Sequence, residues 1–158
     1  MDYIIRELRG DEAEILNDFL YEAIFLPAGT SPPPREIIYQ PELQVYVADF
    51  GRHRGDLALI AETEGKPVGA VWARIMDDYG HIDNETPSLA ISLYPGYRGM
   101  GLGTALMKAM LDRLKAAGYL RVSLSVQKEN YAVRMYRKAG FVTVHETDEE
   151  YIRICRLI

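Results

Sequence analysis

The sequence is poor in the residues that hold metals and disulfides. Among 158 residues it has one cysteine, Cys155, and three histidines, His53, His81 and His145. A single cysteine excludes an intrachain disulfide and a cysteine-rich metal site, and the histidines lack zinc-binding spacings such as HExxH. We therefore expect no metal centre. Because Cys155 has no histidine beside it, we expect a buried side chain there and not a nucleophile.

Long apolar runs and an excess of positive charge are also missing. No apolar run approaches the roughly 20 residues that a helix needs to cross a bilayer. The opening residues 1–6, MDYIIR, lack the basic start and the apolar stretch of a secretory signal. The formal net charge is −5, which argues against a nucleic-acid partner. These absences predict a cytoplasmic protein that works with neither a membrane nor a nucleic acid.

What is present fits one α/β domain. The length of 158 residues, with 48% hydrophobic and 26% charged residues, is typical of a single globular domain. Alternating and helical hydrophobic patterns predict the order β-α-α-β-β-β-α-β-α-β-β. Strands are expected at 2–8, 56–63, 68–76, 89–94, 120–126, 141–145 and 151–157. Helices are expected at 12–26, from 102 to a stop at Gly118, at 131–139, and as one or two short helices within 35–50.

A glycine-rich segment, 98–103, lies between a predicted strand and a predicted helix. Its glycines, Gly99, Gly101 and Gly103, alternate along the chain and remove the Cβ atoms that would block a close ligand. Such a turn can direct several backbone amides to one point in front of a helix N-terminus, which carries a partial positive charge. This arrangement suits a pyrophosphate, to which Arg98 can add a charge-assisted contact.

The glycine spacing alone leaves several interpretations open. A Walker phosphate loop requires a lysine, and Gly103-Thr104-Ala105 has none. A dinucleotide-binding fold requires an acid at the end of the next strand, which here ends Ser125-Val126-Gln127. A glycine-rich turn without any ligand remains a further alternative on these residues.

Two longer segments narrow the choice. Residues 93–103, LYPGYRGMGLG, resemble the cofactor motif of the GCN5-related N-acetyltransferase (GNAT) superfamily, in which an apolar strand end and a Pro turn precede Arg/Gln-x-x-Gly-x-Gly/Ala. Residues 130–141, NYAVRMYRKAGF, resemble the same family's second signature, Asn-x-x-Ala-x-x-x-Tyr-x-x-x-Gly-Phe, although Ala132 stands one place early. The order of predicted elements also fits, so the resemblance covers nearly the whole chain.

The resemblance implies a fold and a cofactor. The expected fold is a single N-acetyltransferase domain, 1–158, of the α/β (α+β) class. A central mixed, mostly antiparallel sheet of six to seven strands, flanked by about four helices, would splay between strands 88–94 and 120–126. The expected cofactor is acetyl-CoA, whose pantetheine arm would enter this gap. The residues expected to bind it are Leu93, Tyr94, Arg98, Gly99, Met100, Gly101, Leu102, Gly103, Thr104 and Asn130.

The resemblance also implies direct transfer of the acetyl group to a primary amine in a ternary complex. Tyr136 matches the family's general acid, since a phenol with an ordinary pKa of about 10 is protonated at neutral pH and can protonate the departing sulfur. Glu85, just before the central strand, is the expected general base. Its rivals are Asp77, Asp78, His81 and Asp83, and water.

The acceptor itself is open. Tyr21, Glu22 and Phe25, at the end of the first predicted helix, are the candidate acceptor-binding residues. The acidic loop 77–86 could attract a cationic amine. Two alternatives to an N-acetyltransferase stay open: a sensor domain that binds acyl-CoA without catalysis, and transfer to another acceptor such as a hydroxyl. The alternation in the closing strands also offers an edge for a homodimer.

Overall fold

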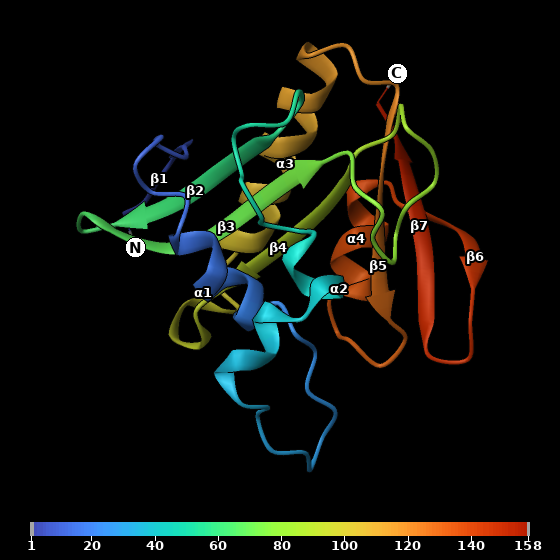
Figure 1. Cartoon of the computed structure of the whole chain (residues 1–158), viewed down its shortest axis with the longest axis horizontal. Helices are drawn as coiled ribbons and strands as arrows, with labels where there is room; N and C mark the ends of the chain where they lie inside the picture. The colour runs from blue at the N-terminus through green and yellow to red at the C-terminus, as the bar shows by residue number, and fades with distance from the viewer. Residues whose placement is uncertain (1, 158) are drawn as a thin grey trace.

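Residues 2–157, which the computed structural model describes, are organised around one seven-stranded sheet in the order β1-β2-β3-β4-β5-β7-β6 (Figure 1). Neighbouring strands run antiparallel except for β4 and β5, which are parallel. The predicted mixed, mostly antiparallel sheet is therefore confirmed. The strands are β1 (Ile4–Glu7), β2 (Leu57–Thr63), β3 (Lys66–Arg74), β4 (Ser88–Leu93), β5 (Arg121–Gln127), β6 (Val142–Glu146) and β7 (Glu150–Arg156).

Four α-helices cover the two faces of the sheet. In Figure 1, α1 and α2 lie on one face, and α3 and α4 lie on the other. The helices are α1 (Ile15–Glu22), α2 (Pro41–Gln44), α3 (Leu102–Ala116) and α4 (Val133–Ala139), with 3-10 turns η1 (Arg35–Tyr39) and η2 (Pro95–Tyr97). None of the helices in residues 2–157 has the length and apolar character needed to span a bilayer.

Helix α1 is shorter than the predicted range 12–26. The later start follows from Glu12, whose carboxylate accepts hydrogen bonds from the backbone N–H of Arg9, at 2.8 Å, and from the Arg6 guanidinium. The chain from 9 to 14 therefore forms turns, and the helix begins only at Ile15. Pro41 begins α2, as expected from its place in the sequence.

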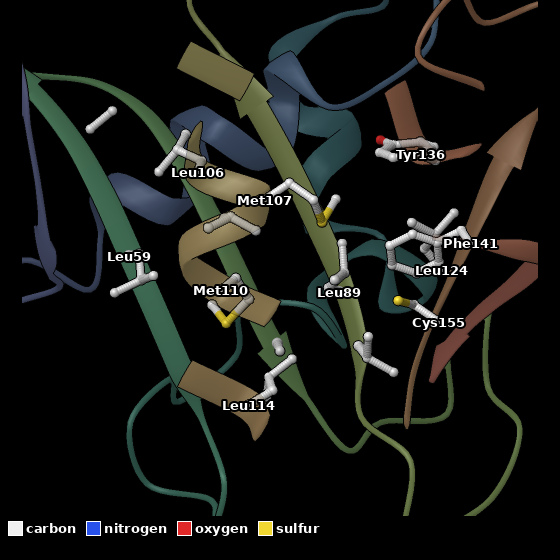
Figure 2. Packing of buried hydrophobic residues seen from close by; sticks show 14 of the residues in the cluster. Leu59, Leu89, Leu106, Met107, Met110, Leu114, Leu124, Tyr136, Phe141 and Cys155 are labelled. Atoms are coloured by element: carbon white, nitrogen blue, oxygen red, sulfur yellow. The ribbon is translucent and has the colours of Figure 1, made fainter. Parts of the chain in front are cut away.

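The larger core lies between the sheet and α3. Leu102, Leu106, Met110 and Leu114 recur every four residues along α3, and all four are buried. Figure 2 shows the side chains of Leu106, Met107, Met110 and Leu114 along one side of this helix, facing the strands. Truncating one such leucine to alanine typically costs about 2–5 kcal/mol. This packing fixes the start of α3 relative to the end of β4.

The opposite face holds a buried arginine. The Arg74 guanidinium, 2% exposed, pairs with Asp56 at 2.8 Å and donates to the carbonyls of Val45 and Ala48 at 3.1 and 2.9 Å. The indole N–H of Trp72, on the same strand, donates to the carbonyl of Tyr46 at 3.1 Å. Together these contacts hold the segment that follows α2 against β3.

The sheet splays between β4 and β5. Within residues 2–157 these strands share one paired position, Ser88 opposite Ser123, where the Ser123 N–H donates to the Pro87 carbonyl at 2.9 Å. Beyond this point the two strands separate towards Leu93 and Gln127. The splay predicted between strands 88–94 and 120–126 is confirmed.

Candidate functional site

Two cavities open where β4 and β5 separate. The larger cavity, about 730 Å³, runs from the end of β4 along the glycine turn to α4, and residues 21–26 and 32–33 form its other wall. The smaller cavity, about 370 Å³, lies between the α1–α2 region, β4, β5 and the start of β7. Six residues line both cavities: Ala23, Ile24, Phe25, Ile91, Asn130 and Tyr136. The two cavities therefore meet beside these side chains.

The glycine turn forms one end of the larger cavity. Gly99 and Gly101 have φ angles of 76° and 86°, in the left-handed region that glycine adopts without strain. Gly103 differs, because a Cβ there would only meet Leu93 and Met135 side chains at 3.8 Å. The turn thus requires the first two glycines for its conformation, whereas the third leaves room in the cavity.

The turn presents the N-terminus of α3 to the larger cavity. The first helical hydrogen bond runs from the Ala105 N–H to the Gly101 carbonyl at 3.1 Å. The N–H groups of Gly103 and Thr104, which both line the cavity, therefore have no partner within the helix. A long helix with such free donors and a partial positive charge suits an anion.

Arg98 connects the glycine turn to α1. Its Nε donates to the Leu93 carbonyl at 3.1 Å, and its Nη2 pairs with the Glu22 carboxylate at 3.3 Å. Both Arg98 and Glu22 line the larger cavity. The arginine charge predicted to meet a phosphate is thus partly balanced by a carboxylate of the protein itself.

Not every predicted cofactor residue reaches a cavity. The structure brings Leu93, Arg98, Gly99, Gly101, Gly103, Thr104 and Asn130 together at the larger cavity. Tyr94 lies elsewhere, since its N–H donates to the Val68 carbonyl at 3.0 Å and its ring packs on Phe19 at 4.9 Å between centroids. The Leu102 side chain is buried in the core, and Met100 is 56% exposed.

Asn130 and Tyr136 stand at the junction of the cavities. The Asn130 Oδ1 accepts the Ala132 N–H at 2.9 Å and so caps the turn that leads into α4. The Tyr136 ring is buried and packs edge-on against Phe141, 6.0 Å away between centroids. Figure 2 shows the Tyr136 oxygen directed away from the α4 ribbon and towards β4. Burial raises the pKa of this phenol above its usual value, so it is protonated at neutral pH.

The larger cavity is lined by all three residues predicted to bind the acceptor substrate, Tyr21, Glu22 and Phe25. Phe25 lines the smaller cavity as well. Tyr21 has a second role, because its hydroxyl donates to the Pro33 carbonyl at 2.6 Å and its ring lies under the Arg35 guanidinium. It therefore fixes the proline-rich segment that walls the cavity.

The structure brings neither Glu85 nor its rivals to the cavities. Glu85 is exposed in the loop before β4, and its N–H donates to the Asp83 carboxylate at 2.9 Å. Asp83 in turn pairs with Arg121 at 2.5 Å, at the closed end of the splay. Asp77, Asp78 and His81 are also absent from the lining of both cavities.

A carboxylate that the sequence did not predict as a site residue lies at the smaller cavity. Glu150, at the start of β7, lines the smaller cavity and accepts a hydrogen bond from the Gln127 side chain at 2.9 Å. Burial, and to a lesser extent the charge of Glu149, raises the pKa of Glu150. Gln127 could have been found as the last polar position of the alternating strand β5. Glu150 could not, because its place depends on the pairing of β7 with β5.

A third recess, about 540 Å³, lies between α3 and α4 and adjoins the larger cavity through the shared residues Thr104, Tyr131 and Met135. It contains three cations, Lys108, Arg134 and Lys138, and one acid, Asp112. We call this feature the cationic recess. Its charge extends the anion-binding character of the α3 N-terminus along the surface.

Comparison with known proteins assigns the family. The model of the acetyltransferase (GNAT) family matches residues 19–141, which is most of the chain. The chain therefore belongs to the acetyltransferase (GNAT) family, and the resemblance seen in its two motifs is confirmed.

Two curated relatives have similar sequences. A mycothiol acetyltransferase of Sanguibacter keddieii is 32% identical over 127 residues, which cover 79% of this chain and 40% of that protein. An acetyltransferase of Pectobacterium atrosepticum is 32% identical over 93 residues, which cover 58% of this chain and 62% of that protein. The matched part of the chain thus spans less than two thirds of either relative's length.

Solved structures agree with the fold. The PaiA N-acetyltransferase of Thermoplasma acidophilum, in complex with coenzyme A, superposes with a TM-score of 0.75 at 20% identity over 99% of each chain. The ribosomal-protein-S18-alanine N-acetyltransferase of Escherichia coli gives a TM-score of 0.67 at 17% identity, over 99% of this chain and 94% of that one. At these identities the likeness supports the fold alone.

Proposed function

We propose that this chain is an acetyl-CoA-dependent N-acetyltransferase that acts on a primary amine by direct attack in a ternary complex. The observation that carries the proposal is the position of Tyr136, a buried phenol where the two cavities meet. The larger cavity ends at the free N–H groups of Gly103 and Thr104 in α3, and the smaller cavity does not reach these groups. A donor and an acceptor can therefore approach the same hydroxyl from two sides.

The residues of the larger cavity fit acetyl-CoA. The Gly103 and Thr104 amides would hold the pyrophosphate, and Lys108, Arg134 and Lys138 of the cationic recess would face the outer phosphate. The coenzyme A bound to the PaiA N-acetyltransferase, which has the same fold, supports this choice. When bound, acetyl-CoA supplies an acetyl group activated as a thioester.

The chain's own contribution is to position the acceptor and supply a proton. Tyr136 would donate its proton to the sulfur as the bond to carbon breaks, because burial keeps the phenol neutral. The same hydroxyl distinguishes the enzyme from a sensor domain that only binds acyl-CoA. Replacing Tyr136 with phenylalanine should slow thiol release in the presence of amines, with little change in acetyl-CoA binding.

A melting experiment tests the cofactor. Acetyl-CoA should raise the melting temperature, since it binds only the folded state. Gly103→Glu should abolish this shift by placing bulk and negative charge in the larger cavity without requiring a left-handed backbone. Gly96→Glu adds the same charge nearby, outside both cavities and the cationic recess, and should leave the melting shift intact. An unchanged shift in Gly103→Glu would contradict the assigned site.

A homodimer through the closing strands stays a prediction. β6 forms one edge of the sheet, and Val142 and Val144 on it are 58% and 50% exposed. The register of β6 with β7 shifts between Thr143 and His145, and such a bulge disfavours regular pairing with another strand. Light scattering of wild type and Val144→Lys would measure whether this edge joins two copies.

A further inference from the structure

We infer that the smaller cavity takes a primary amine with one positive charge and an apolar body, and that the Glu150 carboxylate binds its ammonium group and removes a proton from it. The inference rests on the proposed function, because a bound amine can react only if the larger cavity holds an acetyl donor. It replaces the loop acids before β4, which reach neither cavity, with a carboxylate inside one.

The charge of the smaller cavity favours a cation. Two carboxylates, Glu42 from α2 and Glu150 from β7, line it. Among the residues 2–157 that the structure describes, no lysine, arginine or histidine lines it. An ammonium group would therefore meet only negative formal charge, whereas a substrate carboxylate would be repelled.

The remaining lining favours an apolar body. Most of the lining residues are aliphatic or aromatic, including Leu20, Phe25, Ile37, Leu43 and Tyr46. Burying an apolar substituent against these side chains is favourable, whereas a second ammonium group there would lose water with only the exposed Glu42 carboxylate as a partner. A compact alkyl or arylalkyl amine matches both the carboxylates and the apolar side chains of the smaller cavity.

Glu150 is held in place for this role. Its position opposite Gln127 in the β5–β7 register lets the Gln127 amide donate to Oε1 at 2.9 Å. The second oxygen is an acceptor for the ammonium. Tyr136 lines the same cavity, so a general acid and a general base would act on one bound amine.

The surroundings make Glu150 a stronger base than an exposed glutamate. Burial and the adjacent Glu149 raise its pKa, and Glu42 adds a second negative charge to the same cavity. The nearby cation Lys128 is paired with Glu146 at 2.6 Å. A carboxylate with a raised pKa accepts a proton more readily and remains ionised above that pKa.

The proton balance is complete with these two residues. Glu150 takes one proton from the ammonium, and the free amine forms the C–N bond as the C–S bond breaks. Tyr136 gives its proton to the sulfur and regains one from the new amide nitrogen, while Glu150 releases its proton to solvent. The sum is ammonium plus thioester giving amide, thiol and one proton.

A calorimetric experiment tests binding without turnover. Wild type, Glu150→Gln and the control Glu129→Gln, which removes an exposed carboxylate outside both cavities, are each saturated with coenzyme A and titrated with 2-phenylethylamine, spermidine and phenylalanine. Wild type should prefer 2-phenylethylamine, Glu150→Gln should bind it about 10-fold more weakly or worse, and Glu129→Gln should match wild type. Tighter binding of spermidine or phenylalanine would overturn the substrate class.

Kinetics then separate the inference from the function on which it rests. For Glu150→Gln, kcat/KM with 2-phenylethylamine should fall about 100-fold, and the acidic limb of its pH profile should disappear. If wild type transfers acetyl groups and Glu150→Gln keeps both its rate and its pH profile, the inference fails and the proposed function stands. If wild type does not bind acetyl-CoA, the proposed function fails. If wild type binds acetyl-CoA but releases thiol with none of these amines, the substrate class fails.

Discussion

Ser88 of β4 and Ser123 of β5 face one another at the point where the sheet begins to splay, with their hydroxyl oxygens 3.3 Å apart. Each hydroxyl also binds the loop that crosses this point. Ser88 donates to the Asp78 carboxylate at 2.8 Å, and Ser123 donates to the Gly80 carbonyl at 2.7 Å. The closed end of the splay and one wall of the smaller cavity, which includes Tyr79, are therefore fixed together.

Gly80→Ala should disturb this junction. A Cβ at Gly80 would lie 3.0 Å from the backbone carbon of Leu124 and from the backbone nitrogen of Ser125, and strand backbone cannot move aside easily. We expect a loss of about 1–3 kcal/mol in the free energy of unfolding. The KM for the amine should rise more than the Kd for acetyl-CoA.

Urea unfolding and steady-state kinetics provide these measurements. Gly96→Ala is the matched control, because a Cβ there meets nothing within 4 Å. Unchanged stability in Gly80→Ala would mean that the loop moves away from β5 at little cost.

The differences between sequence and structure have physical causes. The two motifs predicted the glycine turn and Tyr136 because each is a local pattern whose residues act within one turn and one helix. Tyr94 was expected to bind the cofactor through its backbone, but the pairing of its N–H with Val68 depends on where β3 and β4 end. Glu85 was chosen by its distance from β4 along the chain. The path of its loop is set by the hydrogen bond that Gly80, within the loop, accepts from Ser123, which is remote in sequence.

Arg74→Met should destabilise the protein strongly. The substitution leaves the buried Asp56 carboxylate without its guanidinium partner and removes the donors to Val45 and Ala48. Breaking one side of a buried ion pair typically costs about 3–5 kcal/mol. Because Tyr46 lies within the released segment, weaker amine binding should accompany the loss of stability.

Chemical denaturation measures the first effect, and amine titration of the folded fraction measures the second. Arg52→Met removes an exposed arginine from the same region and should change the free energy of unfolding little. Equal stabilities of the two variants would contradict the structural role assigned to Arg74.

Glu12 should make stability depend on acid pH. Hydrogen bonding from Arg6, and to a lesser extent from the Arg9 N–H, lowers the pKa of Glu12 to about 2, whereas an ordinary glutamate titrates near about 4.3. Since the folded pKa is the lower one, the stabilisation is fully present above the ordinary pKa and is lost as the pH falls towards 2.

Melting temperatures of wild type and Glu12→Gln between pH 7 and pH 2 test this dependence. The difference between the two proteins should be largest at neutral pH and should shrink through the acid range. Glu14→Gln removes an exposed carboxylate from the same segment and should show a smaller difference. A difference in melting temperature between wild type and Glu12→Gln that stays constant across this pH range would contradict the prediction.

Gly103→Ala should raise stability and leave cofactor binding unchanged. Gly103 lies in the first turn of α3 without a left-handed backbone, so alanine there should raise the stability of the unliganded protein by up to about 1 kcal/mol. The new methyl group meets only Leu93 and Met135 at 3.8 Å, which is an ordinary contact, and it occupies space in the larger cavity. Because the family's cofactor motif accepts alanine at this position, the melting shift produced by acetyl-CoA should stay the same while the unliganded melting temperature stays equal or rises. Gly96→Ala serves as the control for an added methyl group outside the cavity. Loss of the acetyl-CoA shift in Gly103→Ala with stability retained would contradict this expectation, because it would mean that the bound pyrophosphate fills the space of the new methyl group.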